Sequence, residues 1–243
     1  MATLARTPSV RMRSERRFFT TMACVALLLV FIGFAPSFYL RGLIPIHPLV
    51  PLNLLVLTHG LVFSSWIILF AVQTGLVATG NIAIHRRLGL LGMAMIAIMI
   101  PLAIVTAIGG VHRPTGPPGI DPLSWLAVPL VNVPVFGGMI VTALAFRRSP
   151  VIHKRLMLIA MMTMMQPAIG RIPFPPPIRG PVAMLGLSTL VFVPLMLWDW
   201  RTRGRVHPAT AWGSAIVVFS YFLTPAIWHT GWWLGFARWV SMA

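Results

Sequence analysis

The sequence is divided into long apolar runs, and this feature constrains the fold more than any other. A run of about 20 apolar residues is long enough to cross the hydrocarbon core of a bilayer as an α-helix. Such runs predict about seven transmembrane spans, at roughly 19–40, 52–79, 87–109, 124–146, 155–171, 181–199 and 209–229. We therefore expect an all-α fold, a polytopic transmembrane helical bundle.

The composition supports a membrane protein and argues against a soluble one. Only 9% of the residues are charged and 58% are hydrophobic, whereas ordinary soluble domains contain about 25% charged residues. The net charge of +16 would suggest nucleic-acid binding in a soluble protein. Here the basic residues gather between the apolar runs, where they set topology and contact anionic lipid. We therefore expect no nucleic-acid partner.

The distribution of basic residues predicts the orientation. With the N-terminus in the cytoplasm, most Lys and Arg residues face the cytoplasm, as the positive-inside rule requires. The cytoplasmic set is Arg6, Arg11, Arg13, Arg16, Arg17, Arg86, Arg87, Arg147, Arg148, Lys154, Arg155, Arg201, Arg203 and Arg205. The outer set is Arg41, Arg113, Arg171, Arg179 and Arg238. An odd number of spans then places the C-terminus outside.

These predictions give three segments. A basic cytoplasmic tail covers residues 1–18, a seven-helix transmembrane domain covers 19–229, and a Trp-rich tail at the outer interface covers 230–243. We predict a multi-pass protein of the bacterial inner membrane. Its expected partners are anionic lipid headgroups at the cytoplasmic face and other membrane proteins.

The second predicted span carries a polar stripe. A spacing of alternately four and three residues puts its members on one helix face: His59, Phe63, Trp66, Phe70 and Gln73. An ionisable residue inside a span normally faces the protein interior or a cavity. We assign cofactor-binding or cavity-lining roles to His59, Trp66 and Gln73, with His59 as a metal ligand. The alternative is that these side chains only hydrogen-bond to neighbouring helices.

Three further histidines are candidates for the same site. His85 and His153 each begin a basic turn at the cytoplasmic interface, where lipid headgroups are an alternative to a bound cofactor. His229 ends the last predicted span on the outer side, about 6 Å further out than His59, so helix tilt is able to bring the two together.

The absence of several sequence motifs argues against particular classes of enzyme and transporter. The chain contains no Walker loop, GxSxG, HExxH or CxxC. Proton-coupled transporters usually depend on an Asp or Glu inside a span, whereas Asp199 lies at a predicted cytoplasmic end. These absences favour a non-enzymatic role without deciding whether the protein is an enzyme, and no catalytic residue is assigned.

The basic turns and the polar stripe together resemble a pattern found in a family of membrane proteins. The run His59-Gly60 … Trp66 … Gln73 … His85-Arg86-Arg87-Leu88-Gly89, with His153-Lys154-Arg155-Leu156-Met157, resembles a family of uncharacterised bacterial polytopic inner-membrane proteins. The resemblance covers roughly residues 50–170. The pattern is also loosely similar to cytochrome b561-type helical bundles, which hold haem between paired histidines. In this sequence His59 is the only histidine well inside a predicted span.

Two functions follow from these observations. One is a haem-linked redox or oxidase-assembly membrane protein, with haem as the cofactor, His59 as an axial ligand, and His85 or His153 near the inner interface. The other is a channel, carrier or lipid-binding helical bundle without enzymatic activity, in which the His59 stripe lines a cavity.

Overall fold

The described part of the chain is helical. The computed structural model describes residues 10–44, 50–113, 116–117, 119–175 and 182–242, and these residues form no β-strand. The first half contains α1 (Val10–Phe34), the π-helical turn η1 (Ala35–Tyr39), α2 (Leu54–Ala78), α3 (Ile82–Gly110), α4 (Pro122–Trp125) and α5 (Ala127–Ala145). The second half contains α6 (Pro150–Thr163), α7 (Gln166–Ile169), η2 (Val182–Leu187), α8 (Ser188–Leu190), α9 (Val193–Arg203), α10 (Pro208–Ile227) and α11 (Gly231–Met242).

Five helical stretches of the described residues are long and apolar enough to cross a membrane. They are Met12–Tyr39, Leu54–Ala78, Ile82–Gly110, Pro122–Ala145 and Pro208–Ile227. Large apolar side chains such as Leu28, Leu90 and Phe219 are more than half exposed on the outside of these helices. Lipid tails would cover such a surface, so the structure supports an integral membrane protein of all-helical fold.

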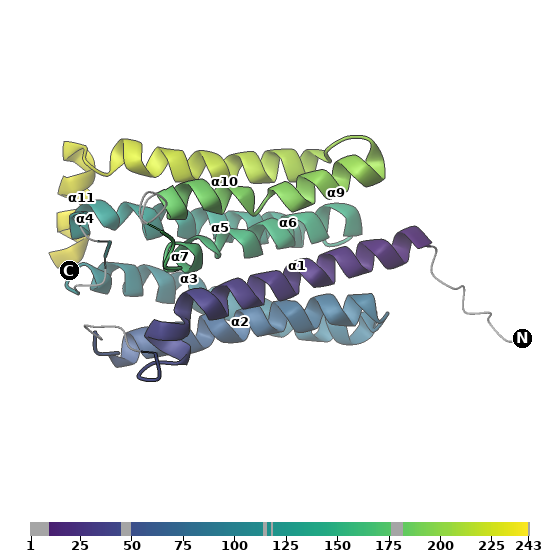
Figure 1. Cartoon of the computed structure of the whole chain (residues 1–243), viewed down its shortest axis with the longest axis horizontal. Helices are drawn as coiled ribbons and strands as arrows, with labels where there is room; N and C mark the ends of the chain where they lie inside the picture. Colours follow the sequence, from purple (N-terminus) through teal and green to yellow (C-terminus); the bar gives the residue numbers. More distant parts are fainter. Residues whose placement is uncertain (1–9, 45–49, 114–115, 118, 176–181, 243) are drawn as a thin grey trace, which may run out of the picture.

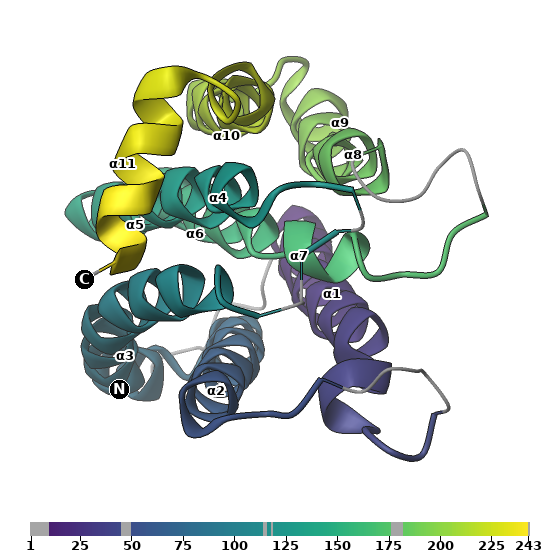
Figure 2. The same cartoon turned by 90° about the vertical axis from the view of Figure 1, so that its left-hand side faces the viewer.

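The helices form a bundle along one axis. The helices that run along the length of the molecule are α1, α2, α3, α5, α6, α9 and α10 (Figure 1). α1 begins at the end of the bundle where the chain turns from α2 into α3. α11 lies across the opposite end, over α4 and α5 (Figure 2). We call the end covered by α11 the α11 end, and the other the α1 end. Neighbouring segments α2 and α3, and likewise α5 and α6, pack against each other as hairpins.

Two predicted spans are not single helices. The predicted span 155–171 is divided between α6 and α7, and Pro167 lies in the first turn of α7. The predicted span 181–199 is divided among η2, α8 and α9, with Pro194 in the first turn of α9. Proline has no N–H to donate and clashes with the preceding turn, so a helix ends or restarts there. Apolarity alone predicted continuous helices across both breaks.

Helices extend into both predicted terminal segments. Of the predicted basic tail, residues 10–18 belong to α1, and residues 1–9 lie outside the described residues. Residues Gly231–Met242 form α11. Trp232 and Trp239 are exposed, but Trp233 is buried and donates its Nε1–H to the Leu123 carbonyl oxygen at 2.9 Å. Trp233 therefore holds α11 against the bundle.

A buried ion pair connects three helices near the α1 end. Arg155 on α6 and Asp199 on α9 are 1% and 0% exposed. The Arg155 Nε atom lies 3.0 Å from Asp199 Oδ1, and a second guanidinium nitrogen contacts the same oxygen. Asp199 also accepts from the Thr210 hydroxyl on α10 at 2.5 Å. Arg155, which belongs to the predicted cytoplasmic set of basic residues, is thus buried in the core rather than exposed.

Candidate functional site

The candidate site is a cavity of about 520 Å³ in the half of the bundle nearer to the α11 end. Residues of α1, η1, α2, α3, α5 and the α6–α7 segment line it. Most of its wall is apolar, and Val30, Ile67, Met99 and Phe136 are representative. Pockets for small organic ligands commonly have volumes of 300–1,000 Å³ and a predominantly apolar lining, so this cavity is large enough for such a ligand.

His59 lines this cavity from α2. Its ring stacks on Phe63, with 4.0 Å between the ring centroids. The Nδ1 atom is buried and has no hydrogen-bond partner in the structure. A buried polar atom without a partner costs free energy, and an incoming ligand or water is able to supply one. His59 is therefore placed where a ligand would contact it.

Gly60 lines the cavity next to His59 and faces the Phe38 ring of η1. A Cβ atom at this position would lie 2.3 Å from the Phe38 ring. The aromatic ring of η1 thus occupies the space beside Gly60, and together they close one side of the cavity.

Polar groups from α5 and the α6–α7 segment form the opposite wall. Asn132 lines the cavity and donates from Nδ2 to Gln166 Oε1. Its Oδ1 atom is buried and without a partner. The wall also contains Thr163, whose hydroxyl donates to the Ile159 carbonyl oxygen at 3.0 Å. Asn132 Oδ1 and His59 Nδ1 are therefore two unsatisfied polar atoms on facing elements.

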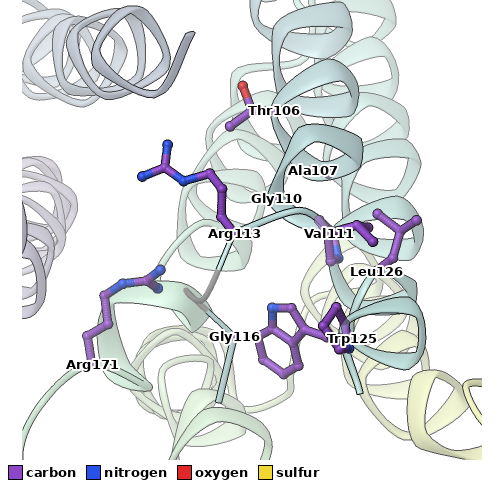
Figure 3. Close-up of a pocket in the computed structure, with 11 residues that line it drawn as sticks. Thr106, Ala107, Gly110, Val111, Arg113, Gly116, Trp125, Leu126 and Arg171 are labelled. Atoms are coloured by element: carbon purple, nitrogen blue, oxygen red, sulfur yellow. The ribbon is translucent and has the colours of Figure 1, made fainter. Parts of the chain in front are cut away.

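Three arginines line the cavity at the α11 end: Arg41, Arg113 and Arg171. Each follows a helical element that runs toward this end, namely η1, α3 and α7. Arg113 and Arg171 also line a smaller pocket of about 150 Å³ that shares several residues with the large cavity (Figure 3). The sequence placed these arginines only in outer connections, because loops that are distant in sequence give no sign that they meet.

Trp66 and Gln73 belong to the interior of the bundle and do not line the described cavity. Trp66 is 5% exposed, and its ring faces Gly92 of α3. Gln73 lies near Gly89 of α3, one turn earlier in that helix. Their Nε1 and Oε1 atoms have no hydrogen-bond partner. Because α2 rises about 1.5 Å per residue, Gln73 lies about 21 Å from His59 along the helix. One small ligand cannot contact both.

His85 and His153 lie together at the α1 end, far from His59. His85 lies in the first turn of α3, and His153 on α6 is near it. The His153 Nδ1 atom lies 2.8 Å from the Ala143 carbonyl oxygen. The adjacent Lys154 pairs with Glu15 at 2.5 Å, so this lysine is already engaged by a carboxylate.

His229 does not join His59. It is exposed at the α11 end, and its Nδ1 atom lies 3.2 Å from the Ser124 hydroxyl of α4. It is not among the described residues that line the cavity. The packing of α11 and α4 at the end of the bundle holds His229 away from α2, so helix tilt does not bring the two histidines together.

The donor set decides how the site fits a metal or haem. No group of three or more His, Cys, Asp or Glu side chains with metal-binding geometry occurs in the described ranges. Of the described histidines, His59 alone lines the cavity. Within the described residues, the cavity therefore offers haem one axial nitrogen and no opposing histidine of a paired-histidine site.

Comparison of the chain with protein-family models, with curated proteins and with solved structures finds no match.

Proposed function

We propose that this protein is a membrane-embedded binding protein that holds a hydrophobic or amphipathic ligand, without catalysing a reaction. One observation carries the proposal: an apolar cavity of about 520 Å³ between the helices, with its three arginines at one end. Such a division suits a molecule with an apolar body and a polar end. A carrier or lipid-binding bundle needs this arrangement, and it needs no catalytic side chains.

The proposal includes a location and an orientation. We infer a multi-pass protein of the bacterial inner membrane with seven spans, in which the broken segments α6–α7 and η2–α9 also cross the bilayer. The excess of basic residues in alternate connections supports an N-terminus in the cytoplasm and a C-terminus outside. The cavity would then lie in the outer half of the membrane. Exposed arginines at the α1 end would contact anionic headgroups: Arg86, Arg87, Arg147 and Arg148.

Filling the cavity tests the binding proposal. Ala103 on α3 lines the cavity, so Ala103→Trp should occupy its space. The lipids and other small molecules that co-purify with the protein in mild detergent are extracted and quantified by mass spectrometry. We expect a bound molecule in the wild-type protein and its loss from Ala103→Trp.

A matched control separates filling from general damage. Ala145 is exposed at the end of α5, outside the cavity, so Ala145→Trp should retain the bound molecule. Gel filtration and thermal unfolding show whether each variant is folded. A folded Ala103→Trp protein that keeps the same ligand would overturn the proposal.

A haem-linked redox or oxidase-assembly role is the second candidate. One observation favours it: the partnerless Nδ1 of His59 in a cavity that also has arginines, which are able to pair with carboxylates such as haem propionates. If haem binds, His59 would hold it, and the protein would supply orientation and an apolar environment.

The visible spectrum of the purified protein tests the haem candidate. This candidate expects a Soret band that both His59→Ala and His59→Gln remove, because an amide is a poor iron ligand. A colourless protein excludes it. The binding proposal expects a colourless protein.

A further inference from the structure

The arginines at the α11 end are held in place by uncharged partners. Arg41 donates from Nη2 to the Val50 carbonyl oxygen at 2.9 Å, and Arg113 donates from Nη2 to the Pro51 carbonyl oxygen at 2.7 Å. Arg171 donates from Nη1 to the Pro167 carbonyl oxygen at 2.8 Å and lies over the Phe34 ring, 4.7 Å from its centroid. These contacts orient the guanidinium groups without neutralising their charge.

No carboxylate of the described residues balances these three charges. The whole chain contains three Asp and Glu residues. Glu15 pairs with Lys154, and Asp199 pairs with Arg155. Asp121 accepts from the Ser124 N–H at 2.9 Å and caps α4. Three cations that share one cavity repel one another and favour a bound anion.

Two buried polar atoms in this region have no hydrogen-bond partner. They are the Nη1 atom of Arg113 and the hydroxyl oxygen of Thr106. Thr106 and Arg113 both line the small pocket and the large cavity. Their unsatisfied atoms mark the place where the anion would bind, because almost all buried polar groups in native proteins are paired.

The small pocket has the size of a headgroup. Its volume is about 150 Å³, and Figure 3 shows Arg113, Arg171 and Thr106 around it, with the indole of Trp125 in the wall. It adjoins the apolar cavity, because residues such as Ala107 and Gly110 line both spaces. A charged group in the small pocket would therefore lie next to apolar chains in the large cavity.

We propose that Arg113 and Arg171 bind the phosphate of an anionic phospholipid whose acyl chains enter the 520 Å³ cavity. This inference rests on the proposed binding function and names its ligand class. Guanidinium groups bind phosphate oxygens through two parallel hydrogen bonds, and such charge-assisted bonds are about twice as strong as neutral ones. The apolar cavity favours a lipid over a free phosphate ion, and the bilayer supplies lipid at high local concentration.

Native mass spectrometry of the purified full-length protein tests this proposal. Phosphatidylglycerol and phosphatidylcholine with identical acyl chains are added in turn, and the bound fraction is measured. We expect roughly tenfold tighter binding of phosphatidylglycerol, because both lipids offer a phosphate but the arginines of the cavity would repel the choline cation of phosphatidylcholine. Arg113→Gln with Arg171→Gln should abolish the preference. Arg238→Gln is the matched control, because Arg238 is exposed on α11, lines neither cavity, and should leave the preference unchanged.

The other outcomes are distinguishable. Equal binding of both lipids, lost in Ala103→Trp, overturns the headgroup assignment and leaves the binding function standing. Absence of bound lipid of either kind overturns both. Displacement of phosphatidylglycerol by millimolar inorganic phosphate would show a simple anion site and overturn the lipid assignment. If the Gln variants unfold, Arg113→Lys with Arg171→Lys keeps the charge, and its preference should fall without disappearing because lysine lacks the two-pronged geometry.

Discussion

A guanidinium and a carboxylate that are both removed from water stabilise a fold only while both are present. Arg155 and Asp199 are in this situation, and Thr210 adds a third contact from α10. Removal of one partner leaves an uncompensated buried charge, which costs far more than the pair contributes. These residues thus determine how α6, α9 and α10 are held together.

Asp199→Ala should lower the free energy of unfolding by about 3–5 kcal/mol. Replacement of both partners by apolar residues, Arg155→Met with Asp199→Leu, should cost less than the single change. Denaturant unfolding in detergent measures both. Glu15→Ala is the control, because the Glu15–Lys154 pair is partly exposed and contributes about 1 kcal/mol or less. Equal losses in Asp199→Ala and Glu15→Ala would contradict this account.

His207 makes the start of α10 sensitive to pH. Its Nδ1 atom accepts from the Ala209 N–H at 3.0 Å and caps the helix. Burial lowers the pKa of His207 from its usual 6.5, and the charges of Arg155 and Arg203 lower it further. The fold therefore favours the neutral ring. Stability is present above pH 6.5 and is lost as the pH falls below that value toward the folded pKa, because the unfolded chain takes up the proton first.

The apparent melting temperature of the wild-type protein should therefore fall between about pH 7.5 and pH 5.5. His207→Asn keeps a capping acceptor that does not titrate, so part of this fall should disappear, with a cap contributing about 1 kcal/mol. Thermal unfolding of both proteins at both pH values measures the difference. An identical pH dependence in the variant would show that His207 is not responsible.

At the scale of elements, the close approach of α1 and α7 positions the basic end of the cavity. A Cβ atom on Gly33 would lie 2.3 Å from the Ala168 carbonyl oxygen, so the two backbones touch there. Small residues permit such approaches between membrane helices. Arg171 follows α7 directly, and its position depends on this contact.

Gly33→Ala should destabilise the protein by about 1–3 kcal/mol, because the added methyl group forces the backbones apart. It should also weaken phosphatidylglycerol binding by moving Arg171. Gly138→Ala on α5 is the matched control: no atom lies within 4 Å of its Cβ position, so the change should be neutral or slightly stabilising. Thermal unfolding compares the two variants, and equal melting temperatures would argue against the contact.

For the whole molecule, the number of bilayer crossings decides on which side each end of the chain lies. Five helical stretches of the described residues meet the length and hydropathy of a span, and two predicted spans consist of shorter segments. α1 begins at one end of the bundle and α11 lies at the other (Figure 1). The seven-span arrangement with opposite termini is compatible with this geometry and remains a prediction.

Topology reporters test that arrangement. Fusions after Arg87, Arg148 and Arg203 should report the cytoplasm, and a fusion at the C-terminus should report the periplasm. An alkaline phosphatase and fluorescent protein pair at each site gives complementary signals. A cytoplasmic C-terminus would show that α6–α7 or η2–α9 does not cross the membrane.

The sequence by itself determined the all-helical membrane class, because apolar length and sparse charge are local properties. It also indicated the face of α2 that turns inward, since helical period alone puts His59 and Trp66 on one side. It misjudged the continuity of spans 155–171 and 181–199, where Pro167 and Pro194 interrupt apolar runs.

Only the tertiary structure decided which distant residues meet. The pairing of Arg155 with Asp199 joins residues that are 44 positions apart. Arg41, Arg113 and Arg171 come from three separate connections and share one cavity, while Gln73 and His229 are separated from His59. The physical reason is that helix packing fixes these distances, and packing depends on the shapes of all facing side chains, which no single span specifies.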